Sequence, residues 1–247
     1  MKRLFDMVGS AAGLVIALPI LLPVMFLVWK QDSHSPFYVA QRVGKAGKPF
    51  SMVKLRSMVI GADKSGVDST GSNDQRITKI GHFIRRCKLD ELTQLWNVLV
   101  GDMSLVGPRP NVQRETDLYT DLERRLLSIK PGITDFASIV FSDEGEILKD
   151  ADDPDIAYNQ LIRPGKGYLG LFYIDNSSLW LDIRLCFYTA VAILSREKAL
   201  IGIRGILQSI GAPNNIVLIA ARNDPLQPMP PPGGVKIVTS RDGNPNI

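Results

Sequence analysis

The stretch MVGSAAGLVIALPILLPVMFLVW, residues 7–29, contains 23 residues and no ionisable side chain. As one straight helix it would extend about 34 Å, which is enough to cross a lipid bilayer. Pro19 and Pro23 lie inside the run, and a proline inside a helix removes a backbone hydrogen bond and bends the helix. A sharp bend would leave two arms of about 15 to 18 Å, each of which reaches the bilayer midplane without crossing it.

Three interpretations of residues 7–29 remain open at this point. A cleaved signal peptide fits least, because the run is long and no small-residue cleavage site precedes the polar sequence. A spanning helix and a re-entrant hairpin fit about equally, because cations lie on both sides of the run, at Lys2 and Lys30. In the re-entrant form the carbonyls freed near Pro19 need partners such as Ser10, because lipid offers none.

The rest of the composition excludes several kinds of site. The 247 residues suit one domain with appendages. Cys87 and Cys186 are too far apart in sequence for a zinc knuckle or a disulfide framework, and the two histidines stand alone. No serine-hydrolase elbow, HExxH motif or P-loop occurs. The net charge is only +4, yet basic residues cluster between 42 and 114, which predicts an anionic partner for that region.

The residues after the apolar run predict an α+β body that is mostly helical. Residues 37–42 and 50–55 alternate around a glycine-rich turn, which predicts a β-hairpin. Residues 61–75 are polar and aperiodic, which predicts a loop over the site. Apolar residues at helical spacing from Ile77 to Ile84, with cations on the other faces, predict a basic amphipathic helix.

The second half of the chain gives weaker signals. Residues 131–134 predict a turn that enters a strand, and the acidic residues 143–155 predict an exposed insertion. A serine-capped helix is expected over about 179–195, either in the core or in the membrane interface. The proline-rich tail from Gly211 predicts an appendage with two short strand-like runs, 216–221 and 235–239.

Asp90 and Glu91 begin a predicted helix. Leu92, Leu95, Trp96 and Leu99 form its apolar stripe. The simple interpretation makes Asp90 an N-cap and Glu91 a first-turn acid that the helix dipole favours.

The cations just upstream, Arg85, Arg86 and Lys88, favour a chemical role for the acidic pair. A carboxylate beside cations stays ionised, so Asp90 is a candidate nucleophile towards a phosphate. Glu91 is a candidate metal ligand or proton carrier, and oxygen ligands favour Mg²⁺.

Arg109 stands between Pro108 and Pro110. Stiff flanking residues present one guanidinium, which suits either a solvated turn or a clamp for a diphosphate.

Four stretches together resemble the bacterial sugar transferases called monotopic phosphoglycosyl transferases. The resemblance covers about residues 1–200, and the stretches that carry it are 37–44, 54–58, 89–99 and 101–110. It implies a membrane enzyme that moves a phosphosugar from a nucleotide diphosphosugar, usually UDP-linked, to a polyprenol phosphate. It also implies that Asp90 attacks the phosphate that bears the sugar, expels UMP and holds a covalent phosphosugar until polyprenol phosphate removes it.

The resemblance also implies the other site residues. Glu91 assists with Mg²⁺, which it would hold together with Asp90, or with proton transfer. Five cations are expected to bind the phosphates of the substrate, the charge-stabilising role that phosphoryl transfer needs. They are Lys54, Arg56, Arg85, Lys88 and Arg109.

The same resemblance implies the organisation of the chain. We expect a re-entrant membrane hairpin over 1–30, a cytoplasmic catalytic domain with interfacial amphipathic helices over 31–210, and an appendage over 211–247. The implied place is the cytoplasmic face of the bacterial inner membrane, in the first membrane step of glycoconjugate assembly. The expected partners are the nucleotide sugar, polyprenol phosphate and the bilayer, without nucleic acid, and a homodimer is left open.

The sequence departs from the family pattern at three places. The family breaks its membrane helix at Ser-Pro, whereas this chain has Leu18-Pro19, and Thr93 replaces a common proline. After Thr134 the usual Gly-x-x-Gln-x-x-Gly-Arg pattern is replaced by residues 135–138 and the acidic segment, so the identity of the sugar stays open.

A non-catalytic membrane scaffold is the competing interpretation. Its basic surface would bind anionic lipid or nucleic acid, with binding that falls steeply with salt and does not depend on Asp90.

Overall fold

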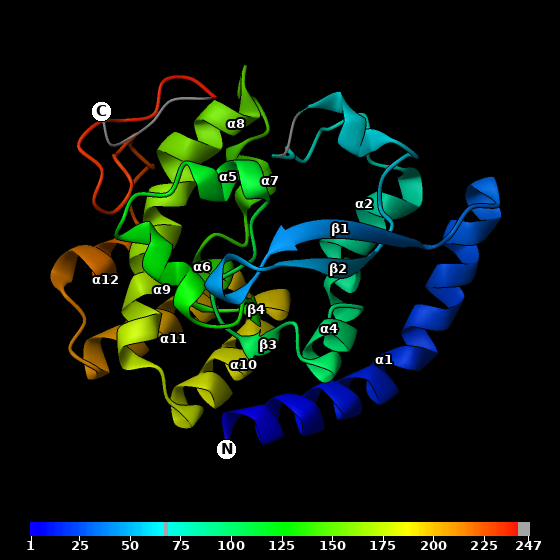
Figure 1. The fold of residues 1–247 in the computed structure, drawn as a ribbon, viewed down its shortest axis with the longest axis horizontal. Coiled ribbons are helices and arrows are strands. Elements are labelled where there is room, and N and C mark those ends of the chain that lie inside the picture. The colour runs from blue at the N-terminus through cyan, green and yellow to red at the C-terminus, as the bar shows by residue number, and fades with distance from the viewer. Residues whose placement is uncertain (67–68, 242–247) are drawn as a thin grey trace.

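A single long helix, α1 (Lys2–Asp32), carries the apolar run in the computed structural model, which describes residues 1–66 and 69–241. The helix runs along the lower edge of the molecule and then bends upward along its right-hand side (Figure 1). Pro19 and Pro23 both lie inside it. The expected helix-break-helix is therefore one bent helix, because helical turns continue through both prolines.

The inner face of α1 packs against the body, and its outer face is left exposed. Leu21 and Val28 are buried in a small cluster with Leu55 and Ile84. Many large apolar side chains on the other face of α1 are exposed, and the helix is long and apolar enough to cross a membrane. The expectation for Ser10 is wrong, because its Oγ donates to the carbonyl of Met7, 3.2 Å away and one turn earlier, and not to a carbonyl near Pro19.

The first turns of α1 are bonded to the body. Lys2 Nζ lies 2.5 Å from Asp182 Oδ2. The buried Asp6 carboxylate accepts hydrogen bonds from Ser104 Oγ at 3.0 Å and from the backbone N–H of Leu105 at 2.9 Å. A buried carboxylate is tolerated only when such donors replace water, so these contacts fix where the helix begins.

The last turn of α1 is bonded to the same body through Arg56. Its guanidinium reaches Asp32 Oδ2 at 2.5 Å and Oδ1 at 2.7 Å, and it donates to the carbonyl of Ser35. A cation at a helix C-terminus is favoured by the helix dipole. Both ends of α1 are therefore tied to one side of the protein.

The expected β-hairpin is confirmed. Strand β1 (Phe37–Val43) pairs antiparallel with β2 (Pro49–Leu55), from Phe37 opposite Leu55 to Val43 opposite Pro49. The open edge of β2 is covered by side chains: Asn97 Oδ1 accepts from the N–H of Val53 at 2.9 Å, and Thr93 Oγ1 donates to its carbonyl at 3.1 Å.

These polar contacts show why the predicted apolar stripe holds only in part, since Leu95 is buried and Leu92 packs on a buried cluster, but Trp96 does not. Thr93 and Asn97 are buried, whereas Trp96 is 53% exposed. The helix is also split into α3 (Leu89–Leu92) and α4 (Leu95–Val100). The buried face is the one whose Thr93 and Asn97 side chains bond to β2, and the apolar face that contains Trp96 points outward.

A second sheet, of two short parallel strands, forms the base of the Pro-Arg-Pro loop. Strand β3 (Ser104–Val106) pairs with β4 (Gly132–Thr134), which confirms the strand expected there. A Cβ on Gly132 would lie 2.1 Å from the backbone N of Gly107, so the two chains approach this closely only because both residues are glycine.

The remaining helices fall into two groups. Short helices occupy the middle of the chain: α2 (Lys79–Arg86), α5 (Gln113–Asp117), α6 (Phe136–Val140), α7 (Glu144–Ile147) and α8 (Pro154–Ala157). A bundle follows: α9 (Arg163–Asn176), α10 (Leu179–Leu194), α11 (Arg196–Ser209) and α12 (Asn214–Ala221). Single turns of other helix types lie at Lys45–Gly47, Ala62–Ser65, Glu123–Ser128 and Tyr158–Ile162.

The main core lies among α6, α9, α10, α11 and α12, and it explains two corrections. The predicted strand over 216–221 is helix α12, whose Ile216, Val217 and Ala220 are buried in this core. No strand forms over 235–239 either, although Val238 is buried and its carbonyl accepts a hydrogen bond from Gln160. The described part of the tail, up to Arg241, thus packs on the body.

The acidic segment is not an exposed insertion. Asp143 forms ion pairs with Arg196 and Arg222, each at 3.0 Å, and Glu144 pairs with Lys166. Asp155 is 2% exposed. Cations that are distant in sequence pair with these acids and neutralise them. The spacing of residues along the sequence does not reveal such pairs.

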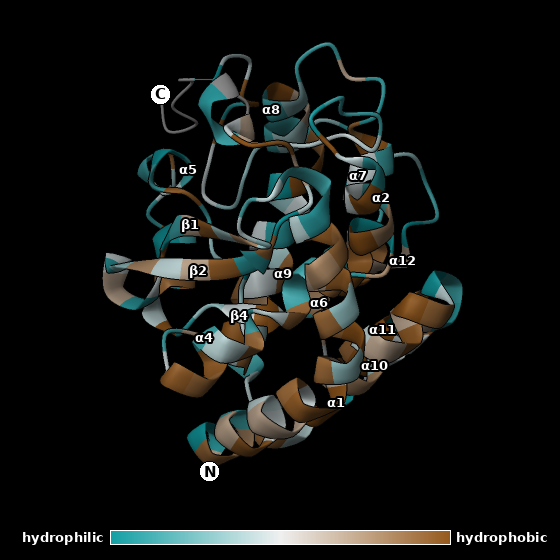
Figure 2. Cartoon of the chain, turned by 90° about the vertical axis from the view of Figure 1, so that its right-hand side faces the viewer, coloured by the Kyte–Doolittle hydropathy of each residue, from teal (hydrophilic) through white to brown (hydrophobic). Residues whose placement is uncertain are grey.

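Helix α10 packs in the core on one face and exposes apolar side chains on the other. Ser178 caps it, as expected, by accepting a hydrogen bond from the N–H of Leu181. Leu181 and Leu185 are buried in the core, whereas Trp180 and Phe187 are exposed. In Figure 2, α1, α10 and α11 lie together at the lower edge with largely apolar colouring.

Arg163→Met is expected to destabilise the protein by about 3 to 5 kcal/mol. Arg163 and Glu123 form an ion pair at 2.7 Å, with side chains 3% and 1% exposed, so removal of the arginine leaves a buried, unpaired carboxylate. Thermal or denaturant unfolding in detergent would measure the change. The double variant Arg163→Met with Glu123→Gln should recover part of the loss, and equal instability of the two variants would contradict this account.

Candidate functional site

Asp90 and Glu91 lie in the first turn of α3, next to the end of the hairpin. Lys88 is the residue before this helix, with φ 55° and ψ 25°, and its side chain provides no cap. Asp90 is therefore not the N-cap that the simple interpretation expects. Thr93 Oγ1 bonds to the carbonyl of Asp90 at 3.2 Å and to β2, which fixes the turn that carries the acidic pair.

The Asp90 carboxyl is partly buried among charges of both signs. Burial raises its pKa, Glu91 adds to the rise, and the cations Lys54, Arg85 and Arg109 oppose it. The cations that the sequence places near Asp90 do act to keep it ionised, but removal from water acts in the opposite direction and outweighs them. A carboxylate that is poorly solvated is a stronger nucleophile when it is ionised.

Glu91 is held in its ionised form by Arg109. Oε1 of Glu91 lies 2.9 Å from Nη1 of Arg109. Burial acts to raise the pKa of Glu91, but Arg109, with Lys88 and Lys54, lowers it to about 2. The arginine between the two prolines is therefore not a solvated turn residue, because it is one partner of a half-buried ion pair.

Lys54 completes the centre of the site from strand β2. Burial lowers its pKa to about 8, Arg109 contributes to the fall, and Asp90 and Glu91 raise it. A lysine with this pKa is mostly charged at neutral pH and loses its proton a little above it.

The structure brings together four of the five predicted cations. Lys54, Arg85, Lys88 and Arg109 all act electrostatically on Asp90 or Glu91. Arg56 is the exception, because its guanidinium is 7% exposed and is used by the C-terminus of α1. It bonds to the last turn of α1.

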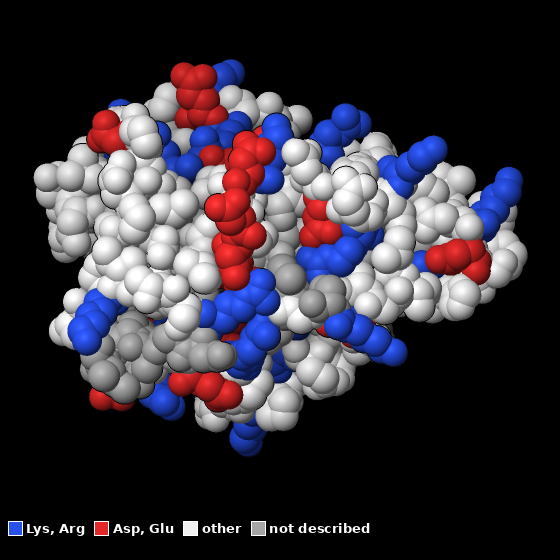
Figure 3. Space-filling view, turned by 90° about the horizontal axis from the view of Figure 1, so that it is seen from above, with Lys and Arg blue, Asp and Glu red and all other residues white. Residues whose placement is uncertain are grey.

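Two charged residues that sequence analysis missed extend the site. Glu144 of α7 raises the pKa of Arg109, and Lys166 of α9 pairs with Glu144. The charges thus alternate from Glu91 through Arg109 and Glu144 to Lys166. Local sequence gave no signal for this, because the four residues come from segments spread over 75 positions, from 91 to 166. In Figure 3, acidic and basic side chains lie side by side in the middle of the face seen from above.

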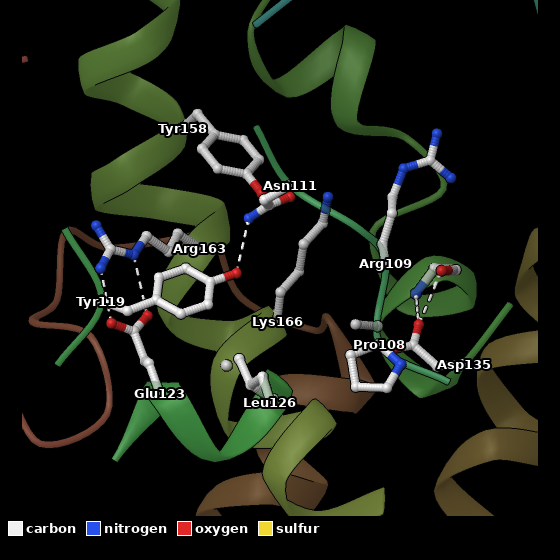
Figure 4. A pocket seen from close by; sticks show the side chains of 13 residues that line it. Pro108, Arg109, Asn111, Tyr119, Glu123, Leu126, Asp135, Tyr158, Arg163 and Lys166 are labelled. Carbon is white, nitrogen blue, oxygen red and sulfur yellow. Dashed lines mark hydrogen bonds and ion pairs between the residues drawn. The ribbon is translucent and has the colours of Figure 1, made fainter. Parts of the chain in front are cut away.

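A cavity of about 40 Å³ lies next to Arg109 (Figure 4). Tyr119 and Tyr158 contribute aromatic walls, and Asn111 and Lys166 contribute polar groups. Asp135, which replaces the family pattern, also lines the cavity, and its carboxylate caps α6 by accepting from Ser138 N–H at 2.7 Å. The segment that departs from the family therefore lines the same cavity as Arg109, the partner of Glu91.

The acidic pair is the candidate metal-binding group. Within residues 1–66 and 69–241, no cluster of three or more His, Cys, Asp or Glu side chains suits a metal ion. Mg²⁺ commonly needs only one or two carboxylates when substrate phosphates supply other oxygens. Asp90 and Glu91 fit that donor set, since they supply two neighbouring carboxylates.

The family model described as bacterial sugar transferase matches residues 1–196 of the chain. A UDP-galactose-lipid carrier transferase of Erwinia amylovora is 35% identical over 81% of this chain and 41% of its own length. An undecaprenyl-phosphate galactose phosphotransferase of Salmonella typhimurium is 36% identical with the same coverage. A UDP-glucose:undecaprenyl-phosphate glucose-1-phosphate transferase of Klebsiella pneumoniae is 37% identical over 76% of this chain and 39% of its own length. The chain thus spans about two fifths of the length of these relatives.

Acylation of Lys54 by acetic anhydride is expected to follow a titration with a midpoint at about pH 8, because its pKa is lowered to about 8. Peptide mass spectrometry after brief labelling at a series of pH values would measure it. Asp90→Asn should move the midpoint to lower pH, because the Asp90 charge raises the pKa of Lys54. The matched variant Asp121→Asn, at an exposed position, should leave it in place. A midpoint near the ordinary value for lysine, about 10.4, would contradict the site electrostatics.

Proposed function

The chain belongs to the bacterial sugar transferase family, and from this premise we propose that it transfers a phosphosugar from a UDP-sugar to undecaprenyl phosphate. The observation that carries the proposal is the placement of Asp90: a partly buried carboxyl surrounded by Lys54, Arg85 and Arg109, in a body joined to a long apolar helix. The names of the relatives support the substrates, because they combine UDP-sugars with undecaprenyl phosphate or a lipid carrier.

In the first step an oxygen of Asp90 attacks the phosphorus that bears the sugar. The bond from this phosphorus to the bridging oxygen breaks, UMP leaves with that oxygen, and an aspartyl phosphosugar forms. In the second step a phosphate oxygen of undecaprenyl phosphate attacks the same phosphorus. The acyl phosphate bond breaks, Asp90 regains its carboxylate, and the product is the undecaprenyl diphosphosugar.

The cations of the site have distinct tasks in this scheme. Lys54 and Arg85 lie in the electrostatic surroundings of Asp90 and offset the charge that builds on the attacked phosphate. Arg109 keeps Glu91 ionised and in place through the 2.9 Å ion pair. This division leaves Asp90 as the less strongly paired of the two carboxylates, as a nucleophile requires.

We assign Mg²⁺ to Asp90 and Glu91 together with phosphate oxygens of the substrate. When bound, the ion would supply positive charge that stabilises the leaving phosphate. Glu91, whose pKa is about 2, is ionised throughout the physiological range and is therefore available as a ligand.

The anchoring of α1 supports a re-entrant, monotopic arrangement at the cytoplasmic face of the inner membrane. A spanning helix would place its two ends on opposite sides of a hydrocarbon layer about 30 Å thick. Here the first turns contact Asp182 and Ser104, and the last turn contacts Arg56, all in one body. The exposed apolar residues of α1, α4 and α10, such as Phe26, Trp96 and Trp180, fit contact with lipid.

Incubation with a UDP-sugar labelled in the sugar, without acceptor, is expected to leave label on the denatured wild-type protein. Asp90→Asn should abolish this labelling, because an amide does not form the acyl phosphate. Asp121→Asn is the matched control at an exposed position and should label like wild type. Undiminished label on Asp90→Asn would exclude Asp90 as the nucleophile, and a scaffold without catalysis predicts no label on any variant.

An N-terminal tag on the full chain is expected to be accessible only from the side that also exposes the body. The reason is that Lys2 and Asp6 bond to residues of the body. Protease or thiol-reagent access in inside-out and right-side-out vesicles would measure this, with a tag after residue 247 as the reference. Access to the two tags from opposite sides would exclude the re-entrant form.

A further inference from the structure

The cavity beside Arg109 contains two polar groups that no protein group satisfies. The Tyr158 hydroxyl has no hydrogen-bond partner among the residues that the structure describes, although the side chain is buried. Asn111 uses its Nδ2 to donate to the hydroxyl of Tyr119 at 3.0 Å, which leaves its carbonyl oxygen available. In Figure 4, Tyr158, Asn111 and Lys166 converge on one region of the cavity. Both oxygens are open to solvent, so a ligand hydroxyl that accepts from one and donates to the other would replace the water that they otherwise bind.

The cations that line the cavity are already paired, and the Asp135 carboxylate in the lining has no cation partner among the described residues. Arg109 pairs with Glu91, Arg163 with Glu123, and Lys166 with Glu144. The lining therefore offers no uncompensated cation for an anionic group, and an added carboxylate would face the loss of its water shell without a new partner. The chemistry of the cavity suits a neutral group that both donates and accepts hydrogen bonds, which describes a hydroxyl.

The size of the cavity sets how much of a ligand enters it. About 40 Å³ of space holds roughly three water molecules. A hydroxyl or hydroxymethyl group fits, whereas a whole sugar ring has to stay outside. Arg109 lines the cavity and also pairs with Glu91, so a ring outside the cavity lies towards the acidic pair.

We propose that this cavity is a subsite for one hydroxyl-bearing edge of a neutral sugar in the UDP-sugar, with Tyr158 as the donor and Asn111 as the acceptor. The inference rests on the proposed function, and it identifies the substrate class as neutral hexoses and not hexuronic acids. It also gives a task to the segment that departs from the family pattern, because Asp135 and Ser138 of that segment line the cavity together with Tyr158. Discrimination by hydrogen bonds to a sugar hydroxyl is strong, since a ligand without the hydroxyl leaves both protein groups unpaired.

Binding measurements on the full chain in nanodiscs test the subsite. The probes are UDP-glucose, UDP-galactose, their 4-deoxy and 6-deoxy analogues, and UDP-glucuronate, each titrated by calorimetry. Wild type is expected to bind one hydroxylated sugar about tenfold more tightly than the analogue that lacks the recognised hydroxyl, and UDP-glucuronate at least as weakly as that analogue. Tyr158→Phe should bring the ratio for the deoxy pair close to one, with the loss confined to the hydroxylated sugar. Asn111→Ala is the second variant and should do the same.

Tyr168→Phe is the matched control, because it removes the same hydroxyl from α9 outside the cavity. It should leave the ratio unchanged. An equal loss for all UDP-sugars in Tyr158→Phe would overturn the proposal, as would a parallel loss in the binding of UMP, which would make the cavity a nucleoside site. Preferred binding of UDP-glucuronate would also overturn it. The affinity ratio decides the subsite, whereas covalent labelling of Asp90 decides the proposed function, so the two failures are distinguishable.

Discussion

The attachment of both ends of α1 to one body is the constraint on which the rest of the structure depends. The buried carboxylate of Asp6 receives its hydrogen bonds from Ser104 and Leu105, in and beside the strand that leads into the Pro-Arg-Pro loop. Arg56, directly after the hairpin strand that carries Lys54, binds the other end of the helix. Groups removed from water need these partners, so the long apolar helix, the hairpin and the loop take fixed positions relative to one another. The site is assembled between the two anchors.

Within the site, pairing and burial give two neighbouring carboxyls different properties. Arg109 holds Glu91 ionised, with a pKa of about 2, whereas burial raises the pKa of Asp90. The same contrast separates the cations: Arg109 is engaged by Glu91, and Lys54, with a pKa of about 8, is the one that titrates near neutral pH. Environments that drive the pKa values of adjacent acids apart are typical of sites where one acid reacts and the other supports it.

Several elements were predictable because their signals are local. Alternation around a glycine-rich turn predicted the hairpin, and a serine before an apolar periodic stretch predicted helix α10. Other predictions failed where residues that are distant in sequence decide which side chains are buried or paired. The apolar stripe of residues 92–99 holds at Leu95 but not at Trp96, because Thr93 and Asn97 turn inward to bond to the edge of β2. The prediction that the acidic segment is an exposed insertion was wrong, because Arg196, Arg222 and Lys166 form ion pairs with it. The prediction of a strand over residues 216–221 was wrong, because burial in a helical core overrode the strand propensity of these residues.

The sequence by itself determined the apolar length of α1, the position of its prolines, the acidic pair and the cations near it, because each depends only on residue type and spacing. It also carried the resemblance that the family match over residues 1–196 confirms. Only the tertiary structure decided that α1 stays continuous, that Arg56 serves the helix and not the site, and that Lys166, Asn111 and Tyr158 join Arg109 around one cavity. The physical reason is that burial and pairing are properties of neighbours in space, and these neighbours come from segments far apart along the chain.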